Sequence, residues 1–163
     1  MKSIFLSLAF LWIFIPSKDI DYLRTTPEEF CLGVNLLLDE RDEQYKTCFG
    51  EKINNKKYMC SRVLPGSMWG NAINSDFPAL TYVMFETKNI DKAANVYKDY
   101  VKQLKICLPH NGYYYTEQFK SRKEEVASCE FTAKGESRAV IKVKVSAYPK
   151  TRNNFSVRID FNS

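Results

Sequence analysis

A thiol and an imidazole lie close together in sequence at Cys107 and His110, and His110 is the only histidine of the chain. Such a pair is the minimum for a nucleophilic cysteine with an adjacent base. The local context argues against this chemistry, because Cys107 follows a predicted helix whose negative end disfavours a thiolate. A tetrahedral metal site would need a second half of matching spacing, which the sequence lacks. We therefore predict a structural disulfide at Cys107 and assign neither catalytic nor metal-binding residues.

The cysteines form the second group of candidates, namely Cys31, Cys48, Cys60, Cys107 and Cys129. In an oxidising compartment, five cysteines predict two disulfides and one free thiol. The preferred pair is Cys107 with Cys129, because Cys129 lies in a strand that is expected to pack beneath the helix that Cys107 ends. The second pair comes from the other three cysteines, as Cys31 with Cys48 or Cys48 with Cys60.

Aromatic side chains are the strongest candidates for binding. Tyr113, Tyr114 and Tyr115 follow Gly112 in a predicted strand, so Tyr113 and Tyr115 share one face and Tyr114 takes the other. Exposed tyrosines, together with Trp69, are typical of surfaces that recognise proteins or sugars. The alternative is that these rings are good strand formers that only fill a sheet.

Carboxylates offer a competing, enzymatic interpretation. Glu117, Glu124 and Glu125 could serve a small hydrolase if two of them lay about 5–10 Å apart beside exposed aromatic rings. The acidic clusters match no loop spacing of a known cation site. The sequence contains neither a phosphate-binding glycine loop nor a nucleophile elbow nor an HExxH motif. We expect no cofactor.

Two predicted helices and a set of predicted strands must position these residues. Apolar residues recur at helical spacing from Ile90 to about Ile106, between a natural N-cap at Asn89 and a stop at Pro109. A shorter apolar stripe follows Pro27 and extends to Leu38. The predicted strands are Tyr58 to Leu64, Met68 to Ile73, Ala79 to Glu86, Tyr113 to Phe119, Val126 to Thr132, Arg138 to Ala147 and Phe155 to Phe161.

This order predicts an α+β fold with two layers, in which an antiparallel sheet packs against two helices. A helix followed by three or four strands occurs twice, which suggests a pseudo-repeat of one α-β unit. At 45% hydrophobic and 26% charged residues, the composition is that of one globular domain.

The N-terminal residues have the pattern of an export signal. One lysine, Lys2, precedes an apolar run from Ile4 to Ile15, and Ser17 supplies a small residue for cleavage. We predict a signal peptide at residues 1–17 and a single domain at residues 18–163, in the periplasm or outside the cell. The alternative is an uncleaved anchor, in which case the protein touches the membrane only through residues 1–17.

The net charge of +5 is spread over single or paired basic residues, so we expect no nucleic-acid partner. The favoured function is an exported, non-catalytic binding module whose partner is another protein or a glycan. One alternative is a small secreted hydrolase or carbohydrate-binding protein. The other is a structural protein anchored in the cell envelope.

Overall fold

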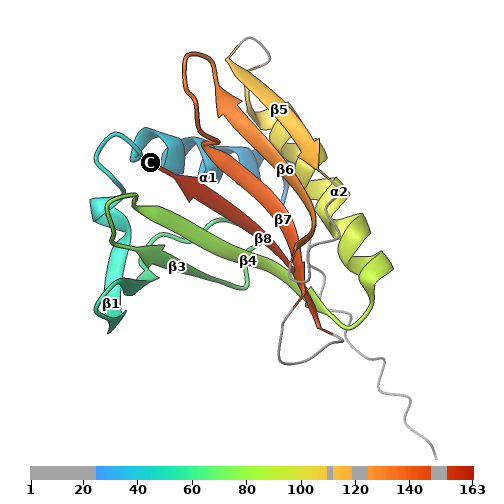
Figure 1. The fold of residues 1–163 in the computed structure, drawn as a ribbon, viewed down its shortest axis with the longest axis horizontal. Helices are drawn as coiled ribbons and strands as arrows, with labels where there is room; N and C mark the ends of the chain where they lie inside the picture. Colours follow the sequence, from blue (N-terminus) through green and yellow to red (C-terminus); the bar gives the residue numbers. More distant parts are fainter. Residues whose placement is uncertain (1–24, 110–111, 119–124, 148–153) are drawn as a thin grey trace, which may run out of the picture.

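The computed structural model describes residues 25–109, 112–118, 125–147 and 154–163 (Figure 1). These residues form one eight-stranded antiparallel sheet and two α-helices, α1 (Pro27–Asp39) and α2 (Ile90–Cys107). The mixed α+β class predicted from the sequence is confirmed. The predicted signal peptide at residues 1–17 lies outside the described residues.

The sheet has the strand order β1-β2-β3-β4-β8-β7-β6-β5, so β4 and β8 pair at its centre and β1 and β5 form its two ends. A short 3-10 helix, η1 (Lys46–Cys48), precedes the first strand. The strands are β1 (Phe49–Asn54), β2 (Lys57–Cys60), β3 (Trp69–Ile73), β4 (Ala79–Thr87), β5 (Tyr113–Gln118), β6 (Glu125–Ala133), β7 (Ile141–Ala147) and β8 (Phe155–Asn162).

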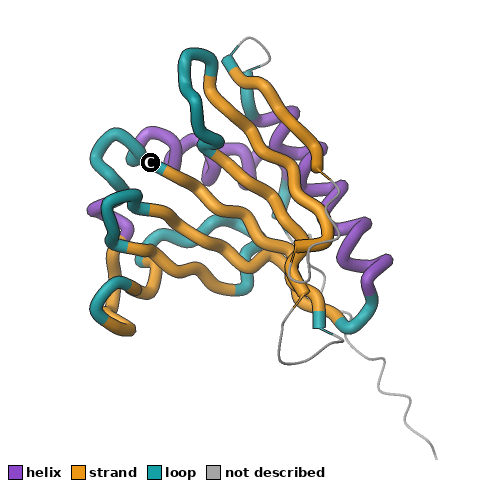
Figure 2. The backbone as a smooth tube through the Cα atoms, viewed as in Figure 1, coloured by secondary structure: helices purple, strands orange, loops and turns teal. Residues whose placement is uncertain are grey.

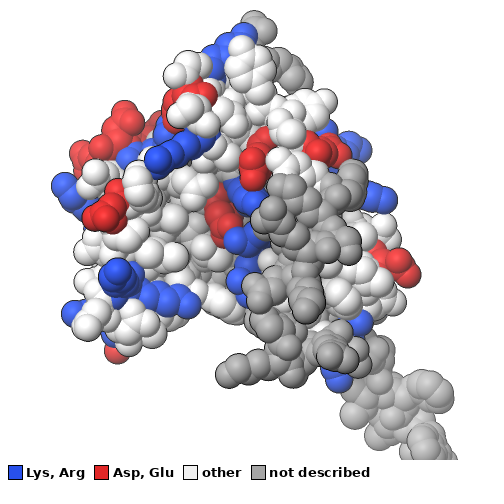
Figure 3. Space-filling model, viewed as in Figure 1, with Lys and Arg blue, Asp and Glu red and all other residues white. Residues whose placement is uncertain are grey.

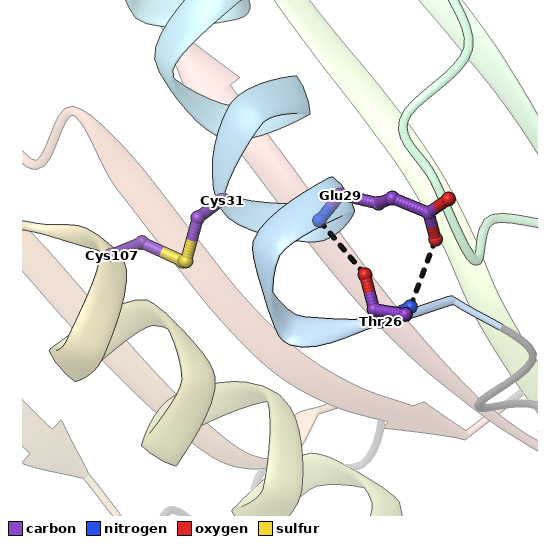
Figure 4. The surroundings of a disulfide bond; sticks show 4 residues. All are labelled: Thr26, Glu29, Cys31 and Cys107. Atoms are coloured by element: carbon purple, nitrogen blue, oxygen red, sulfur yellow. Dashed lines mark hydrogen bonds between the residues drawn. A yellow bond between two sulfur atoms is a disulfide. The ribbon is translucent and has the colours of Figure 1, made fainter.

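Helix α1 begins with a capping box. The Glu29 backbone N–H donates to the Thr26 hydroxyl (3.2 Å), and the Thr26 backbone N–H donates to Glu29 Oε2 (3.0 Å) (Figure 4). This exchange satisfies two backbone donors that a helix start leaves without a partner, and Pro27 at the first position has no N–H to satisfy. The buried side of α1 presents Phe30, Val34 and Leu37 to the core.

Helix α2 starts where the sequence predicted, because the Asn89 side chain accepts hydrogen bonds from the backbone N–H groups of Asp91 and Lys92. It contacts β4, β7 and β8 of the sheet, and α1 contacts α2 (Figure 2). The side of α2 that enters the core consists of Ala93, Val96, Tyr97, Tyr100, Val101 and Leu104. In the described part of the chain, neither helix combines the length and apolarity that a membrane-spanning helix needs.

The strand register separates the two faces of the sheet. On the face that meets α2, Leu80 of β4 lies opposite Phe161 of β8, which lies opposite Ile141 of β7; all three are buried. Cross-strand partners share a face and successive residues alternate between faces, so the row three residues further along the strands belongs to the other face. That row crosses six strands and consists of Trp69, Val83, Arg158, Lys144, Ser128 and Gln118.

The face away from α2 carries charges of both signs. Lys144 forms an ion pair with Asp160, and Lys142 pairs with Glu130 at 3.2 Å. Figure 3 is drawn from this side and shows acidic and basic side chains next to one another near the middle of the face. The two faces therefore differ, because one is the apolar core and the other carries these ion pairs.

Candidate functional site

One disulfide joins the two helices, between Cys31 of α1 and Cys107 at the end of α2 (Figure 4). Their Cα atoms are 4.9 Å apart, within the usual range of disulfides. The predicted pairing of Cys107 with Cys129 is wrong, because the last turn of α2 lies against α1, whereas Cys129 is a free thiol buried in β6. Neither predicted option for the second pair, Cys31 with Cys48 or Cys48 with Cys60, is formed, because Cys31 is bonded to Cys107 and both Cys48 and Cys60 are free thiols. All five cysteines are described, and they form one disulfide where two were predicted.

Two tyrosines of β5, Tyr113 and Tyr115, lie near the end of α2. A cavity of about 200 Å³ lies between that helix end and the sheet, and it is lined by Lys105, Leu108, Pro109, Tyr113, Tyr115 and Phe131. Tyr115 remains 56% exposed, and its ring lies 6.3 Å from the ring of Phe131. Two of the four predicted binding residues, Tyr113 and Tyr115, therefore share one concave site.

Lys105 supplies a fixed positive charge at this cavity. Its ammonium lies 3.8 Å from the centre of the Tyr115 ring and 2.9 Å from Glu117 Oε1. Partial burial lowers the pKa of Lys105, but the hydrogen bond and negative charge of Glu117 outweigh it, so the net shift of this pKa is upward. Lys105 is therefore cationic at neutral pH and is held over the ring by both neighbours.

The other two predicted binding residues lie elsewhere. Tyr114 is 60% exposed and belongs to the opposite face of the sheet from Tyr113 and Tyr115, near Lys134. Trp69 lies on β3 and shares that face with Tyr114, but β3 and β5 are five strands apart in the sheet order. At about 4.8 Å per strand this separation is about 24 Å. Trp69 thus lies apart from all three tyrosines and belongs to a separate surface.

The carboxylates of the enzymatic alternative are only partly described. Glu117 is engaged by Lys105. Glu124 lies outside the described residues, Glu125 begins β6 without a described side chain, and His110 also lies outside the description. In the part of the chain that the structure covers, no three His, Cys, Asp or Glu side chains gather closely enough to hold a metal ion.

A second cluster lies at the other end of the sheet, around two cysteines that the sequence suggested only as one option for a structural disulfide. It contains the thiols of Cys48 and Cys60, which lie close enough for each to shift the pKa of the other. Cys48 Sγ donates to Glu40 Oε2 (2.9 Å), and Cys60 Sγ lies 3.0 Å from the Tyr82 hydroxyl. The sequence signal that could have found it is limited to the short spacing of Cys48 and Cys60 around a predicted turn.

The pKa values of these two thiols shift in opposite directions. The interaction with the Cys48 side chain is the main cause that lowers the pKa of Cys60 to about 7; burial opposes this shift and the Tyr82 hydroxyl supports it. The same contact, with burial and the Glu40 carboxylate, raises the pKa of Cys48. At neutral pH, Cys60 is therefore the more ionised thiol of the pair and Cys48 keeps its proton.

Comparison with protein-family models, curated proteins and solved structures finds no match to this chain. The functional argument therefore rests on the geometry of these sites.

Proposed function

We propose that the protein is an exported, non-catalytic module that binds another protein at the β5 end of its sheet. The observation that carries this proposal is the cavity between Tyr113, Tyr115 and Lys105, at which the Tyr115 side chain is more than half exposed. Exposed aromatic rings around a pocket are the usual anchors of protein interfaces.

The size of the cavity favours a protein side chain over a small molecule. Sites for substrates and cofactors usually enclose about 300–1,000 Å³, whereas this cavity holds about 200 Å³. Its walls are mostly apolar and aromatic, and the charge of Lys105 is already balanced by Glu117. An apolar or aromatic side chain of the partner is the occupant that fits this lining.

The position of β5 supplies a way to hold such a partner. In the described sheet β5 pairs with β6 on one side only, because it is the last strand in the order. An extended segment of a partner can add to such an edge through backbone hydrogen bonds while one of its side chains enters a neighbouring pocket. Trp69 would form a separate contact on the polar face of the sheet.

The test is capture of a partner from the extracellular or periplasmic fluid of the source, followed by affinity measurement with the purified partner. We expect Tyr115→Ala to weaken the complex by about tenfold or more, the effect of losing an interface anchor worth about 1.4 kcal/mol. Trp69→Ala reports on the second surface. Phe77→Ala is the matched control, because Phe77 is an aromatic residue of similar exposure outside both surfaces.

Catalytic turnover would contradict the proposal. The purified full chain is to be assayed on glycoside, ester and peptide substrates. Turnover that Glu117→Gln abolishes would replace the binding module with the hydrolase alternative, in which Glu117 acts as a catalytic carboxylate.

A glycan is the second candidate ligand, favoured by the exposed rings of Tyr114 and Tyr115, on which a sugar can stack. A glycan array probed with the full chain distinguishes the two ligands. Binding to a defined sugar that Tyr114→Ala abolishes, in the absence of a protein partner, would favour the glycan.

Export is supported by the Cys31–Cys107 disulfide, since such bonds persist in oxidising compartments. Mass spectrometry of the protein recovered from its source is expected to find a chain that begins at Lys18. An intact Met1 would favour the anchored envelope protein instead.

We also propose the finer architecture, a two-layer fold built from a duplicated α-β unit. The support is the sheet order, in which β4-β3-β2-β1 and β8-β7-β6-β5 extend in opposite directions from the central pair, each preceded in sequence by one helix. Superposition of the two halves in an experimental structure tests it; helices that cross their own strands in unrelated directions would contradict it.

A further inference from the structure

The backbone holds Cys48 and Cys60 together at the β1 end of the sheet. Cys48 is the last residue of η1 and Cys60 the last residue of β2. Strands β1 and β2 are antiparallel with Phe49 opposite Cys60, and the Ser61 backbone N–H donates to the Cys48 carbonyl at 2.8 Å. The two thiols therefore lie near each other across this pairing, close enough for each to shift the pKa of the other. No movement of a distant segment is needed to bring the sulfur atoms together.

Each thiol also contacts a second side chain, which is a carboxylate for Cys48 and a hydroxyl for Cys60. Glu40 accepts a hydrogen bond from Cys48 and is itself held by the Thr47 hydroxyl and by Arg62, whose Nη2 lies 3.0 Å from Glu40 Oε1. Beside Cys60, the Tyr82 hydroxyl donates to the Arg62 carbonyl at 3.0 Å. A proton acceptor therefore stands next to Cys48, and a neutral hydroxyl stands next to Cys60.

We propose that Cys48 and Cys60 are a dithiol that a small-molecule disulfide, such as oxidised glutathione, converts into the second disulfide of the protein. Cys60 is half-buried and Cys48 is buried, so the incoming disulfide reaches Cys60. The ionisation of the two thiols agrees with this order, because Cys60 has the lower pKa and a thiolate is the attacking species.

The reaction proceeds in two exchanges. The Cys60 thiolate attacks one sulfur of oxidised glutathione, which forms a mixed disulfide and releases one glutathione thiolate. Cys48 then passes its proton through Glu40 to the glutathione thiolate released in the first exchange, and its sulfur attacks Cys60 Sγ, which releases the second glutathione thiolate, protonated from solvent, and closes the Cys48–Cys60 bond. The protein loses two protons and two electrons, and one oxidised glutathione becomes two molecules of the reduced thiol.

Cys129 is excluded from this chemistry. It is fully buried in β6, and burial, with the nearby Glu117 charge second, raises its pKa to about 11. It is therefore the single thiol that remains after the second disulfide forms.

The experiment equilibrates the folded full chain in buffers of increasing oxidised-to-reduced glutathione ratio and counts free thiols after denaturation. We expect the count to fall from three to one, with a loss of two hydrogen masses and a peptide that links Cys48 to Cys60. Three free thiols at every ratio would overturn the proposal, as would a stable glutathione adduct on Cys60 that never resolves.

Two variants separate the steps. Cys48→Ser should stop at the glutathione adduct of Cys60, whereas Cys129→Ser should form the Cys48–Cys60 bond as the wild type does. If Cys48→Ser does not fold, rapid alkylation of the wild-type chain early in the reaction gives the same information. An adduct on Cys60 is expected at that stage, and an adduct that appears first on Cys48 would overturn the proposed order.

Discussion

The two ends of the sheet carry different chemistry. At the β1 end, the thiols of Cys48 and Cys60 are engaged by each other, by Glu40 and by Tyr82. At the β5 end, Tyr114 and Tyr115 expose more than half of their surface, and a cavity opens beside Tyr115.

This difference indicates how each end can act. Substitution of buried groups that contact one another changes the reactivity of those groups and the stability of the protein. Substitution of exposed rings beside a cavity changes the affinity for a partner. Substitutions at the β1 end are therefore expected to alter thiol chemistry, and substitutions at the β5 end are expected to alter affinity at small cost in stability.

The largest effect is expected from the double variant Cys31→Ser, Cys107→Ser. Loss of the helix-to-helix disulfide should lower the free energy of unfolding by about 2–5 kcal/mol, measured by urea denaturation. It should also loosen the β5 end, because Leu108 and Pro109 follow Cys107 and line the cavity. The glutathione reaction of Cys60 should keep its rate; a changed rate would show that the two ends are coupled.

Tyr82→Phe should act at the β1 end. The variant removes a buried hydroxyl that donates to the Arg62 carbonyl and contacts Cys60, so it should cost about 1–3 kcal/mol of stability and slow the glutathione reaction at neutral pH. Tyr97→Phe is the matched control, because the Tyr97 hydroxyl is buried without a hydrogen-bond partner among the described residues. Equal losses from both variants would contradict the role given to Tyr82.

The pH profile of the glutathione reaction tests the ionisation of Cys60. Its pKa of about 7 lies below that of an ordinary cysteine, so the rate should rise about tenfold between pH 6 and pH 8 and then level off. A rate that keeps rising above pH 8 would show an ordinary thiol. Stopped-flow measurement with the Cys129→Ser chain isolates the reacting pair.

The smallest effect on stability is expected from Lys105→Gln at the β5 end. The ion pair with Glu117 is partly exposed, so its loss should change the free energy of unfolding by less than about 1 kcal/mol. Thermal denaturation checks this value. The same variant should weaken the partner complex measurably. A large loss of stability without a loss of affinity would contradict the expectation that the β5 end contributes to binding more than to stability.

Local signals predicted the elements well. Helix α2 starts at the Asn89 cap and its buried side follows the apolar spacing, and strands such as β4 and β8 lie where alternating or continuous apolar residues indicated them. Strand β1 is not among the strands that the sequence predicts. Its residues are mostly exposed and polar, so they carry no alternation to recognise.

Tertiary contacts were beyond local signals. Gly33 is a poor helix former by its type, yet a side chain there would put its Cβ 2.4 Å from Cδ of Pro65, so the close approach of that loop requires glycine. Likewise, the disulfide partner of Cys107 depends on α1 lying beside α2, which no spacing in the sequence encodes. The cavity at Tyr115 arises from β5, β6 and the end of α2 together, and therefore appears only in the folded chain.

The Cys31–Cys107 bond joins positions that are 76 residues apart. That interval contains β1 to β4 and the loops between them, including the long connection from Ser61 to Met68. A protease that cuts a loop within it leaves both pieces covalently attached, and a nicked molecule keeps its full mass until a reductant separates the fragments. Reducing and non-reducing gels of partly digested protein should therefore differ.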